Sequence, residues 1–345
     1  MPYLRDCWYL AAWDHEVPAE GMLSRRILGE PVLFYRDDKG QLTALHDRCP
    51  HRFAPLSRGR IEDGVVYCGY HGLGFAANGK CVANPHGRIV NSLSVRSYPV
   101  KEGYYGVWIW MGDPQLANDT ELPDLDFFKE VAESAYSNGY LHGDANYLLF
   151  VDNICDLTHA DYLHPNTLGG GSYTRTRSKI IERERGLAIQ WHCMNEVPQP
   201  IMRINGLTAD RADSWTEIEW TAPSIMTIRN GSVPAGSPRS SGKNFLVAHI
   251  MTPETETTTH YFFAATRDFA RDDEELNARI AANRVAIFSS EDQPMIEAQQ
   301  ERMEDQEFWS LNPVLLPSDE GAVRVRRKLG AMIQAEAKTA TPQAS

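Results

Sequence analysis

The stretch that decides the fold begins with Cys49-Pro50-His51 and ends with Cys68-Gly69-Tyr70-His71. It supplies two Cys/His pairs, C-x-H and C-x-x-H, which are separated by sixteen residues. Two thiolates and two imidazoles suit a structural zinc ion, or a [2Fe–2S] cluster in which two Cys hold one iron and two His the other. The strand-like run Val65-Val66-Tyr67 lies between the pairs. We therefore expect both pairs at the tips of β-hairpins.

The order of the ligands separates the two kinds of site. A zinc finger presents two Cys close together and then two His on a helix. Here each loop supplies one Cys and one His, so each iron of a cluster would take one type of residue from both loops. The pattern favours a Rieske [2Fe–2S] cluster held by Cys49, His51, Cys68 and His71. Structural zinc and a chance pairing are the alternatives.

Composition excludes several classes of protein. The chain has 345 residues, enough for two domains, and its formal net charge of −12 argues against a nucleic-acid partner. No apolar run approaches the roughly 18 residues of a membrane helix, and the first residues lack the pattern of a secretion signal. Six cysteines do not form a disulfide framework. Cys7, Cys81, Cys155 and Cys193 are expected to be packed free thiols, and a reducing cytoplasm is the expected compartment.

The pattern predicts an α+β protein with two domains. Residues 31–113 show short strands and turn signals, which indicate a small all-β sandwich or barrel. The aromatic-rich residues 1–30 are expected to pack on it, so that residues 1–113 form the first domain. Residues 114–135 are acidic and irregular and are interpreted as a linker. Residues 136–345 alternate helical and β patterns and form the second domain, with a disordered tail expected from about residue 339.

A second set of polar residues lies between Asn153 and His164. The pattern predicts a helix over residues 152–163, ended by Pro165. On a helix, His159 and His164 differ by about 140°, so they can share one ion only if the helix ends or unwinds between them. Two imidazoles are two members of a 2-His-1-carboxylate triad, the open site of non-haem Fe(II) enzymes.

Asp292 is the expected third ligand. It lies on a long helix predicted over residues 272–308, which Pro294 is expected to kink. Asp292 falls on a largely apolar face of that helix, and a buried carboxylate usually needs a cation or a metal ion. Glu291 is expected to face solvent. Two histidines alone are more often structural, but the cluster motif upstream favours the metal site.

With both sets of residues considered, the chain resembles the oxygenase components of the Rieske non-haem iron oxygenases. It is most similar to the vanillate O-demethylase branch, which includes the dicamba and toluenesulfonate monooxygenases. The resemblance implies a Rieske β-domain followed by a helix-grip catalytic domain, in a head-to-tail trimer. It is carried by five segments: Cys49–Arg52, Cys68–Leu73, Val151–His164, Thr252–Glu256 with His260–Phe262, and Glu291–Asp292.

The resemblance also implies how electrons move. Each chain would hold one [2Fe–2S] cluster and one mononuclear Fe(II), and NAD(P)H would supply electrons through a separate ferredoxin or flavin reductase. Electrons would cross from His71 of one subunit to Asp156 of the next. Asp156 in turn touches His159, and Asn153 would lie near the iron.

The expected reaction is O₂-dependent hydroxylation of a methyl or methoxy carbon of an aromatic acid. His249 matches a family position that contacts the acidic group of the substrate, and an interior strand histidine is an equal alternative. Ile228 and Asn283 depart from the dicamba enzyme, whereas Asn230 could bind an anion if the strand register shifts. Dicamba itself is therefore not the expected substrate. Cys155 is unusual within the iron motif and has no functional explanation.

Other functions remain open at this stage. A Rieske electron carrier would leave the second domain unexplained, a zinc-bearing binding module would lack iron, and a cis-dihydroxylating dioxygenase would share the same cofactors. Basic residues surround the first cluster loop, and such a patch would steer an acidic reductase or form ordinary salt bridges. These residues are Arg48, Arg52, Arg58 and Arg60.

Overall fold

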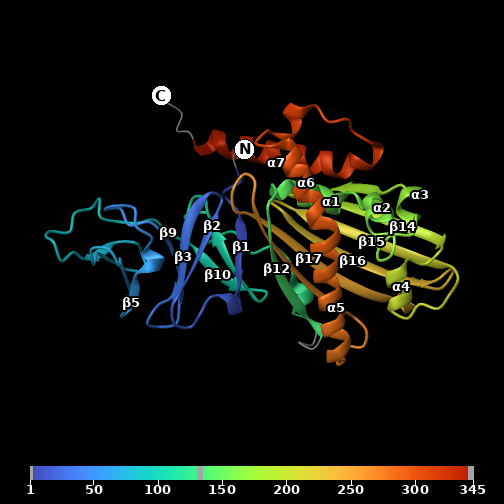
Figure 1. Ribbon diagram of the computed structural model, residues 1–345, viewed down its shortest axis with the longest axis horizontal. Coiled ribbons are helices and arrows are strands. Elements are labelled where there is room, and N and C mark those ends of the chain that lie inside the picture. Colours follow the sequence, from blue (N-terminus) through green and yellow to red (C-terminus); the bar gives the residue numbers. More distant parts are fainter. Residues whose placement is uncertain (1–2, 130–134, 341–345) are drawn as a thin grey trace. The chain divides into compact units, whose positions relative to one another are not determined.

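The computed structural model describes residues 3–129 and 135–340, which divide into two compact units. The N-terminal unit comprises residues 3–123 with 252–255, and the C-terminal unit comprises residues 124–251 and those from 256 on. The predicted α+β class is confirmed, because an all-β unit is followed by one that combines a large antiparallel sheet with helices (Figure 1). Within the described residues, no helix is long and apolar enough to cross a membrane.

The N-terminal unit consists of short antiparallel strands, as predicted. Its strands are β1 (Trp8–Trp13), β2 (Met22–Ile27), β3 (Glu30–Arg36), β4 (Leu42–His46), β5 (Arg60–Glu62), β6 (Val65–Tyr67), β7 (Gly74–Phe75), β8 (Cys81–Ala83), β9 (Ser97–Tyr98), β10 (Val100–Gly103) and β11 (Gly106–Trp110). They form three small sheets, with the orders β1-β11-β10, β2-β3-β4-β9 and β5-β6-β7-β8. Residues 37–41 connect the paired strands β3 and β4 as a hairpin, where Gly40 adopts the left-handed conformation (φ 74°).

The two Cys/His loops rest on one shared core. The first loop connects β4 to β5, which belong to different sheets, so the expected hairpin is wrong there. The second loop connects the paired strands β6 and β7 and is a hairpin tip, as predicted. Buried side chains from both loops and from the flanking strands form a common cluster: Leu33, Leu45, Cys49, Leu56, Val66, Cys68, Leu73 and Phe75.

The C-terminal unit contains one antiparallel sheet of seven strands over the described residues, in the order β12-β18-β17-β16-β15-β14-β13. Their bounds are β12 (Ser137–Gly143), β13 (Lys179–Glu182), β14 (Gly186–Glu196), β15 (Ala212–Thr221), β16 (Ile225–Pro234), β17 (Lys243–Pro253) and β18 (Thr259–Arg267). The helices are α1 (Tyr147–Cys155), α2 (Ala160–Leu163), α3 (Ser172–Arg175), α4 (Pro200–Ile204), α5 (Glu274–Ile287), α6 (Gln293–Met303) and α7 (Glu320–Ala340).

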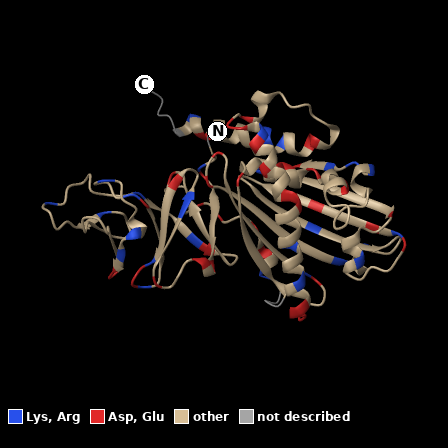
Figure 2. Cartoon of the chain, viewed as in Figure 1, with Lys and Arg blue, Asp and Glu red and all other residues tan. Residues whose placement is uncertain are grey.

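The helices pack against the sheet and against one another. α5 packs against β12, and α1 contacts both α6 and α7 (Figure 1). α5 begins where Asp273 accepts a hydrogen bond from the N–H of Leu276, and acidic residues fill its first turn, which suits the positive end of the helix dipole (Figure 2). Residues 339 and 340 end α7, so the disordered tail predicted from about residue 339 is wrong for these two residues. The rest of the expected tail and residues 130–134 of the expected linker lie outside the described residues.

Candidate active site

The two Cys/His loops share one backbone conformation. In both, the N–H of the cysteine donates to the carbonyl five residues later, at 2.9 Å for Cys49 and 2.8 Å for Cys68. The N–H of the fourth residue after each cysteine returns to the cysteine carbonyl, from Phe53 (2.9 Å) and Gly72 (3.0 Å). Both of these residues have positive φ, 60° for Phe53 and 72° for Gly72. The two loops therefore adopt the same tight turn, and each turn presents one cysteine and one histidine.

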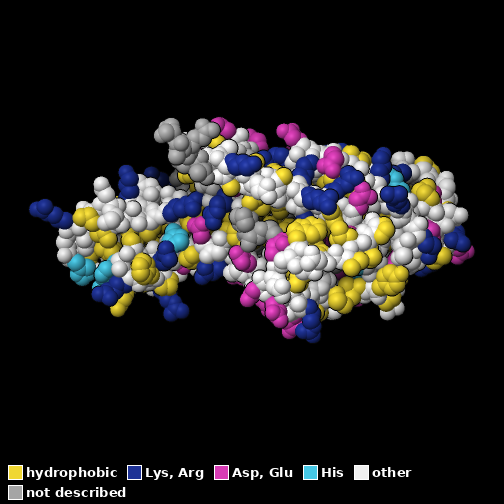
Figure 3. All heavy atoms as spheres, turned by 90° about the horizontal axis from the view of Figure 1, so that it is seen from above, with side chains coloured by type: hydrophobic (Ala, Val, Ile, Leu, Met, Phe, Trp, Pro, Cys, Tyr) yellow, Lys and Arg dark blue, Asp and Glu magenta, His cyan; other side chains and the backbone are white. Residues whose placement is uncertain are grey.

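The side chains of the loops fit the ligand set of a Rieske cluster. The Cys49 and Cys68 thiols are buried side by side, and the rings of His51 and His71 lie 4.5 Å apart. Burial raises the pKa of Cys49, although the N–H groups of His51 and Arg52 donate to its sulfur. Two adjacent buried thiolates thus need a positively charged group between them. Histidine side chains gather on the surface of this unit (Figure 3), so the histidine side of such a cluster would face outward.

The basic residues around the first loop are exposed, and two of them have partners. Arg48 lies over the ring of Phe53 at 5.5 Å, and Arg60 pairs with Glu62 at 2.6 Å. Arg52 and Arg58 are also exposed. Steering of a reductase by this patch stays a prediction.

The predicted helix over residues 152–163 is interrupted at Asp156. α1 ends at Cys155, and Asp156 leaves the helical region (φ −119°, ψ 96°). The Asp156 carboxylate then accepts hydrogen bonds from the N–H and hydroxyl of Thr158, at 2.9 and 2.7 Å, and so starts a short 3₁₀ turn. α2 follows and ends at Leu163, so that His164 is the first residue beyond it. The expectation that the helix ends between the two histidines is confirmed.

The long helix predicted over residues 272–308 is interrupted immediately before Pro294. α5 and α6 are joined by a π-helical turn, Phe288–Asp292, and Pro294 occupies the first turn of α6, where its missing N–H costs nothing. The kink expected at Pro294 is thus a π turn that precedes it. Because π turns add a residue to the helix, they change which side chains point to one side. Asp292 ends this turn and is 3% exposed.

The structure brings His159, His164 and Asp292 together. One ligand atom from each lies within 4.8 Å of the others, which suits a single metal ion. The Asp292 carboxylate lies 3.0 Å from Nε2 of His164 and 3.4 Å from Nε2 of His159, and it accepts a hydrogen bond from the Asn153 amide at 3.0 Å. Burial alone would raise the pKa of Asp292, but its hydrogen bonds with the two imidazoles outweigh burial and hold the pKa well below its usual range.

Each histidine is oriented through its other ring nitrogen. Nδ1 of His159 donates to the backbone carbonyl of Asp156 at 2.5 Å, so the expected contact between these residues exists but does not use the carboxylate. Nδ1 of His164 donates to the Glu291 carboxylate, which also accepts from the Thr167 hydroxyl at 3.1 Å. The prediction that Glu291 faces solvent is wrong, because the π turn directs its carboxylate toward His164. This arrangement fixes both Nε2 atoms toward one point.

The three residues open onto a cavity of about 400 Å³ within the C-terminal unit. The expected substrate contacts Ile228, Asn230, His249 and Asn283 all line it, and their contact with a substrate stays a prediction. Nδ1 of His249 is hydrogen-bonded to the hydroxyl of Tyr261, and burial lowers the pKa of His249 to about 3. His249 is therefore neutral at physiological pH.

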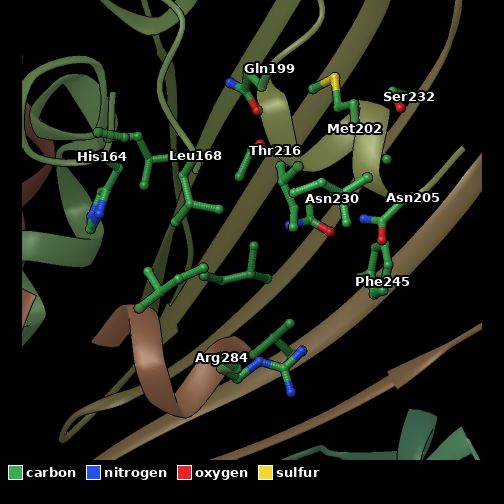
Figure 4. A pocket seen from close by; sticks show the side chains of 18 of the residues that line it. His164, Leu168, Gln199, Met202, Asn205, Thr216, Asn230, Ser232, Phe245 and Arg284 are labelled. Carbon is green, nitrogen blue, oxygen red and sulfur yellow. The ribbon is translucent and has the colours of Figure 1, made fainter. Parts of the chain in front are cut away.

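Two cavity features were missed by the sequence interpretation. Arg284, next to Asn283 on α5, also lines the cavity (Figure 4). The sequence feature that could have indicated Arg284 is its place between Ile280 and Ile287, where a cation interrupts the predicted apolar face of a helix. The second feature is an uncompensated acceptor, because Oδ1 of Asn230 is buried without a hydrogen bond among the described residues. Both features are polar groups in a largely apolar wall.

Comparison with known proteins identifies the family. Residues 7–99 match the Rieske [2Fe-2S] domain, and residues 143–335 match the vanillate O-demethylase oxygenase C-terminal domain. The chain belongs to the Rieske oxygenases of the vanillate O-demethylase type. This Rieske oxygenase is an oxidoreductase and an oxygenase component, as the sequence motifs predict.

Relatives match this Rieske oxygenase over almost its whole length. The oxygenase component of dicamba O-demethylase from Stenotrophomonas maltophilia is 37% identical, over 98% of this chain and 100% of the relative. The oxygenase component of a chloroacetanilide N-alkylformylase from Rhizorhabdus wittichii is 37% identical over 97% of both chains. A crystal structure of dicamba monooxygenase bound to 3,6-dichlorosalicylic acid matches with a TM-score of 0.89 and 36% identity, over 98% of this chain and 99% of the other.

The remaining cysteines have no part in either site. The prediction of free thiols is confirmed, because Cys7, Cys81, Cys155 and Cys193 are all buried and unbridged. Burial raises the pKa of Cys155 well above its usual value. Nothing in the structure explains why a cysteine stands at this position within the iron motif.

Proposed function

We propose that this chain is the oxygenase component of a system that hydroxylates a methyl or methoxy carbon of an aromatic acid. The observation that carries the proposal is the group His159, His164 and Asp292, which opens onto a largely apolar cavity large enough for a single substituted ring. Iron bound there would activate O₂, as 2-His-1-carboxylate sites do. The residues of the chain orient the two imidazoles, shield the site from water and bind the substrate.

The reaction balances with electrons from outside the chain. One oxygen atom of O₂ enters a C–H bond of the methoxy group, and the other leaves as water after it takes up two electrons and two protons. The hydroxylated methoxy group then releases formaldehyde and leaves a phenol. The two electrons would come from NAD(P)H, pass through a ferredoxin or flavin reductase, and enter at the cluster held by Cys49, His51, Cys68 and His71. Oxygenase components among the relatives, such as that of dicamba O-demethylase, support the need for separate partners.

We infer that the chain works as a head-to-tail trimer. In each chain, Asp156 has a carboxylate oxygen beyond the one that binds Thr158, and its backbone carbonyl accepts from His159. Asp156 can therefore accept a hydrogen bond from the outward-facing His71 of a neighbouring subunit. That contact would link one subunit's cluster to the next subunit's iron.

Iron analysis and a product screen test the proposal. The purified holoenzyme should contain about three Fe per chain, two in the cluster and one in the mononuclear site. With a reductase and methoxybenzoates, it should release formaldehyde and the matching phenol in equal amounts. About two Fe per chain would instead indicate an electron carrier. A cis-dihydrodiol product would contradict monooxygenation.

A further inference from the structure

Arg284 is an enclosed cation that faces the substrate cavity. It lies on α5 together with Ile280, Asn283 and Ile287, which also line the cavity and share its helix face at spacings of three and four residues. Protein surrounds the guanidinium on its other sides, yet Arg284 remains partly accessible because it borders the cavity. Burial lowers its pKa to about 10, so the side chain stays charged at neutral pH.

The guanidinium has no partner among the described residues. The carboxylate that lines the cavity is Asp292, and its hydrogen bonds go to His164 and Asn153. Two other cations border the cavity, but Lys243 donates to the carbonyl of Asn205 at 3.4 Å and Arg279 is exposed to solvent. Arg284 therefore combines enclosure with free donors.

Other buried arginines of the same unit have partners, although Nε of Arg267 has none among the described residues. Arg326 makes a two-pronged ion pair with Asp152, with contacts from 2.6 to 3.0 Å. Arg267 donates to the side chain of Asn277 and to two backbone carbonyls, at 2.7 to 2.8 Å. A buried charge without a partner is costly, and proteins normally pair it. The exception at Arg284 indicates that its partner arrives with the ligand.

His249 cannot supply the missing positive charge for an anionic ligand. It is buried and neutral, and one of its ring nitrogens is already hydrogen-bonded to Tyr261. It can offer at most one neutral N–H to the cavity. A planar guanidinium, by contrast, matches a carboxylate or sulfonate with two parallel hydrogen bonds.

The position of Arg284 on the helix limits how the ligand lies. Arg284 precedes Asp292 by eight residues, which corresponds to about 12 Å along a helix axis. Side chains on a helix lean toward its N-terminus, so the guanidinium leans away from Asp292. In Figure 4 the Arg284 side chain likewise extends away from His164. An anion held by Arg284 would therefore lie away from the two histidines, on another part of the cavity wall.

We propose that Arg284 binds the carboxylate or sulfonate of the substrate, and that the carbon to be oxidised lies para to that group. This inference rests on the proposed function, because it takes the two histidines and Asp292 as the reacting end. It names the substrate class: single-ring aromatic acids with the methyl or methoxy group across the ring. Acids that carry the acidic group and the methyl or methoxy group on adjacent carbons fit poorly. When the acidic group binds Arg284, the carbon to be oxidised would lie away from the two histidines and Asp292.

Binding to the full-length holoenzyme tests Arg284 apart from turnover. Dissociation constants are measured for 4-methoxybenzoate, 2-methoxybenzoate, toluene-4-sulfonate and the uncharged 4-methylanisole. Arg284→Met should weaken the two para-substituted anions by roughly ten- to a hundredfold, as expected for a lost charge-assisted hydrogen bond. It should leave 4-methylanisole unchanged. Comparison of the carboxylate and the sulfonate then shows which anion the site prefers.

Matched variants keep the test decisive. Arg302→Met removes an exposed arginine of α6 and should leave the affinity for all four compounds unchanged. Arg284→Lys keeps the charge and should restore most of the affinity, which guards against a variant that has merely lost its fold. Equal affinity of Arg284→Met and wild type for 4-methoxybenzoate would overturn the inference, as would tighter binding of 2-methoxybenzoate by wild type. Loss of formaldehyde formation with this binding pattern intact would instead contradict the proposed function alone.

Discussion

At the scale of single residues, His164 is held by two acidic side chains at once. Its Nε2 atom faces Asp292 and its Nδ1 atom donates to Glu291, although these carboxylates are adjacent in the sequence. The hydrogen bond to Glu291 fixes the tautomer that leaves Nε2 free for a metal ion. The same bond makes the imidazole a stronger donor to that ion. Glu291 is thus a positioning residue.

Substitution of Glu291 should weaken the mononuclear site and spare the cluster. Glu291→Gln removes the negative charge but keeps the size, and loss of such a partner typically costs ten- to a hundredfold in metal affinity, so we expect roughly that loss of iron affinity. Competition with an iron chelator measures it, and the visible absorption of the cluster provides an internal reference. Glu301→Gln, at an exposed position on α6, is the control. Unchanged iron affinity in Glu291→Gln would refute the positioning role.

Residue types indicated the candidate metal ligands, but not the side chains that orient them. The sequence alone indicated the candidate cluster ligands, because their residue types and spacing occur within one short stretch: Cys49, His51, Cys68 and His71. It did not indicate Glu291 and Arg284, since their roles depend on which way a helix faces. A π turn reorients Glu291, and Arg284 is notable because it has no partner among the residues that the structure describes, which no sequence pattern records.

At the scale of elements, the missed C-terminal helix supports the iron motif. α7 buries Ala322, Val325, Leu329 and Ile333, a spacing of three and four residues that was visible in the sequence. Its Arg326 makes a buried ion pair with Asp152 on α1. Because α1 also carries Asn153 and leads into Asp156, this pair links α7 to the site. The sequences of β12, β13 and β16 lack a clear alternation of apolar and polar residues, so the sequence alone does not predict these strands.

Breaking this pair should destabilise the C-terminal unit in a pH-dependent way. Arg326→Met leaves the Asp152 carboxylate without its partner, which should lower the free energy of unfolding by about 3 kcal/mol, the low end for a broken buried pair. Burial already raises the pKa of Asp152, and Arg326 opposes that rise. Without Arg326 the pKa rises further, so the folded state favours the protonated carboxyl. The loss relative to the wild type therefore grows as the pH rises above the already raised pKa of Asp152 in the wild-type fold, and it shrinks on acidification.

Denaturant unfolding at several pH values measures this effect. Arg327→Met, one residue along α7 and exposed, should change stability little at any pH. The double variant Asp152→Asn with Arg326→Met removes the stranded charge and should lose most of the pH dependence. A loss of stability in Arg326→Met that is the same at every pH would show that packing against Phe308, and not the ion pair, is what matters.

At the scale of the whole molecule, the proposed trimer makes activity a property of neighbouring chains. Asp156→Asn should keep the cluster and the mononuclear iron but stop turnover, because the hydrogen-bonded path from the neighbour's His71 is lost. His71→Ala should lose the cluster and keep its iron site. If electrons cross between subunits, an intact cluster in an Asp156→Asn chain can reduce an intact iron site in an adjacent His71→Ala chain. Each variant alone would be inactive, yet trimers that contain both kinds of chain would be active.

Co-expression of the two variants tests this directly. In random head-to-tail trimers, roughly a quarter of the junctions join an intact cluster to an intact iron site, so we expect about a quarter of wild-type activity. Mixing the separately purified variants without exchange of subunits is the control and should stay inactive. Electron transfer within one chain would instead leave both the mixed trimers and the parent variants without activity, because no chain would hold both an intact cluster and Asp156.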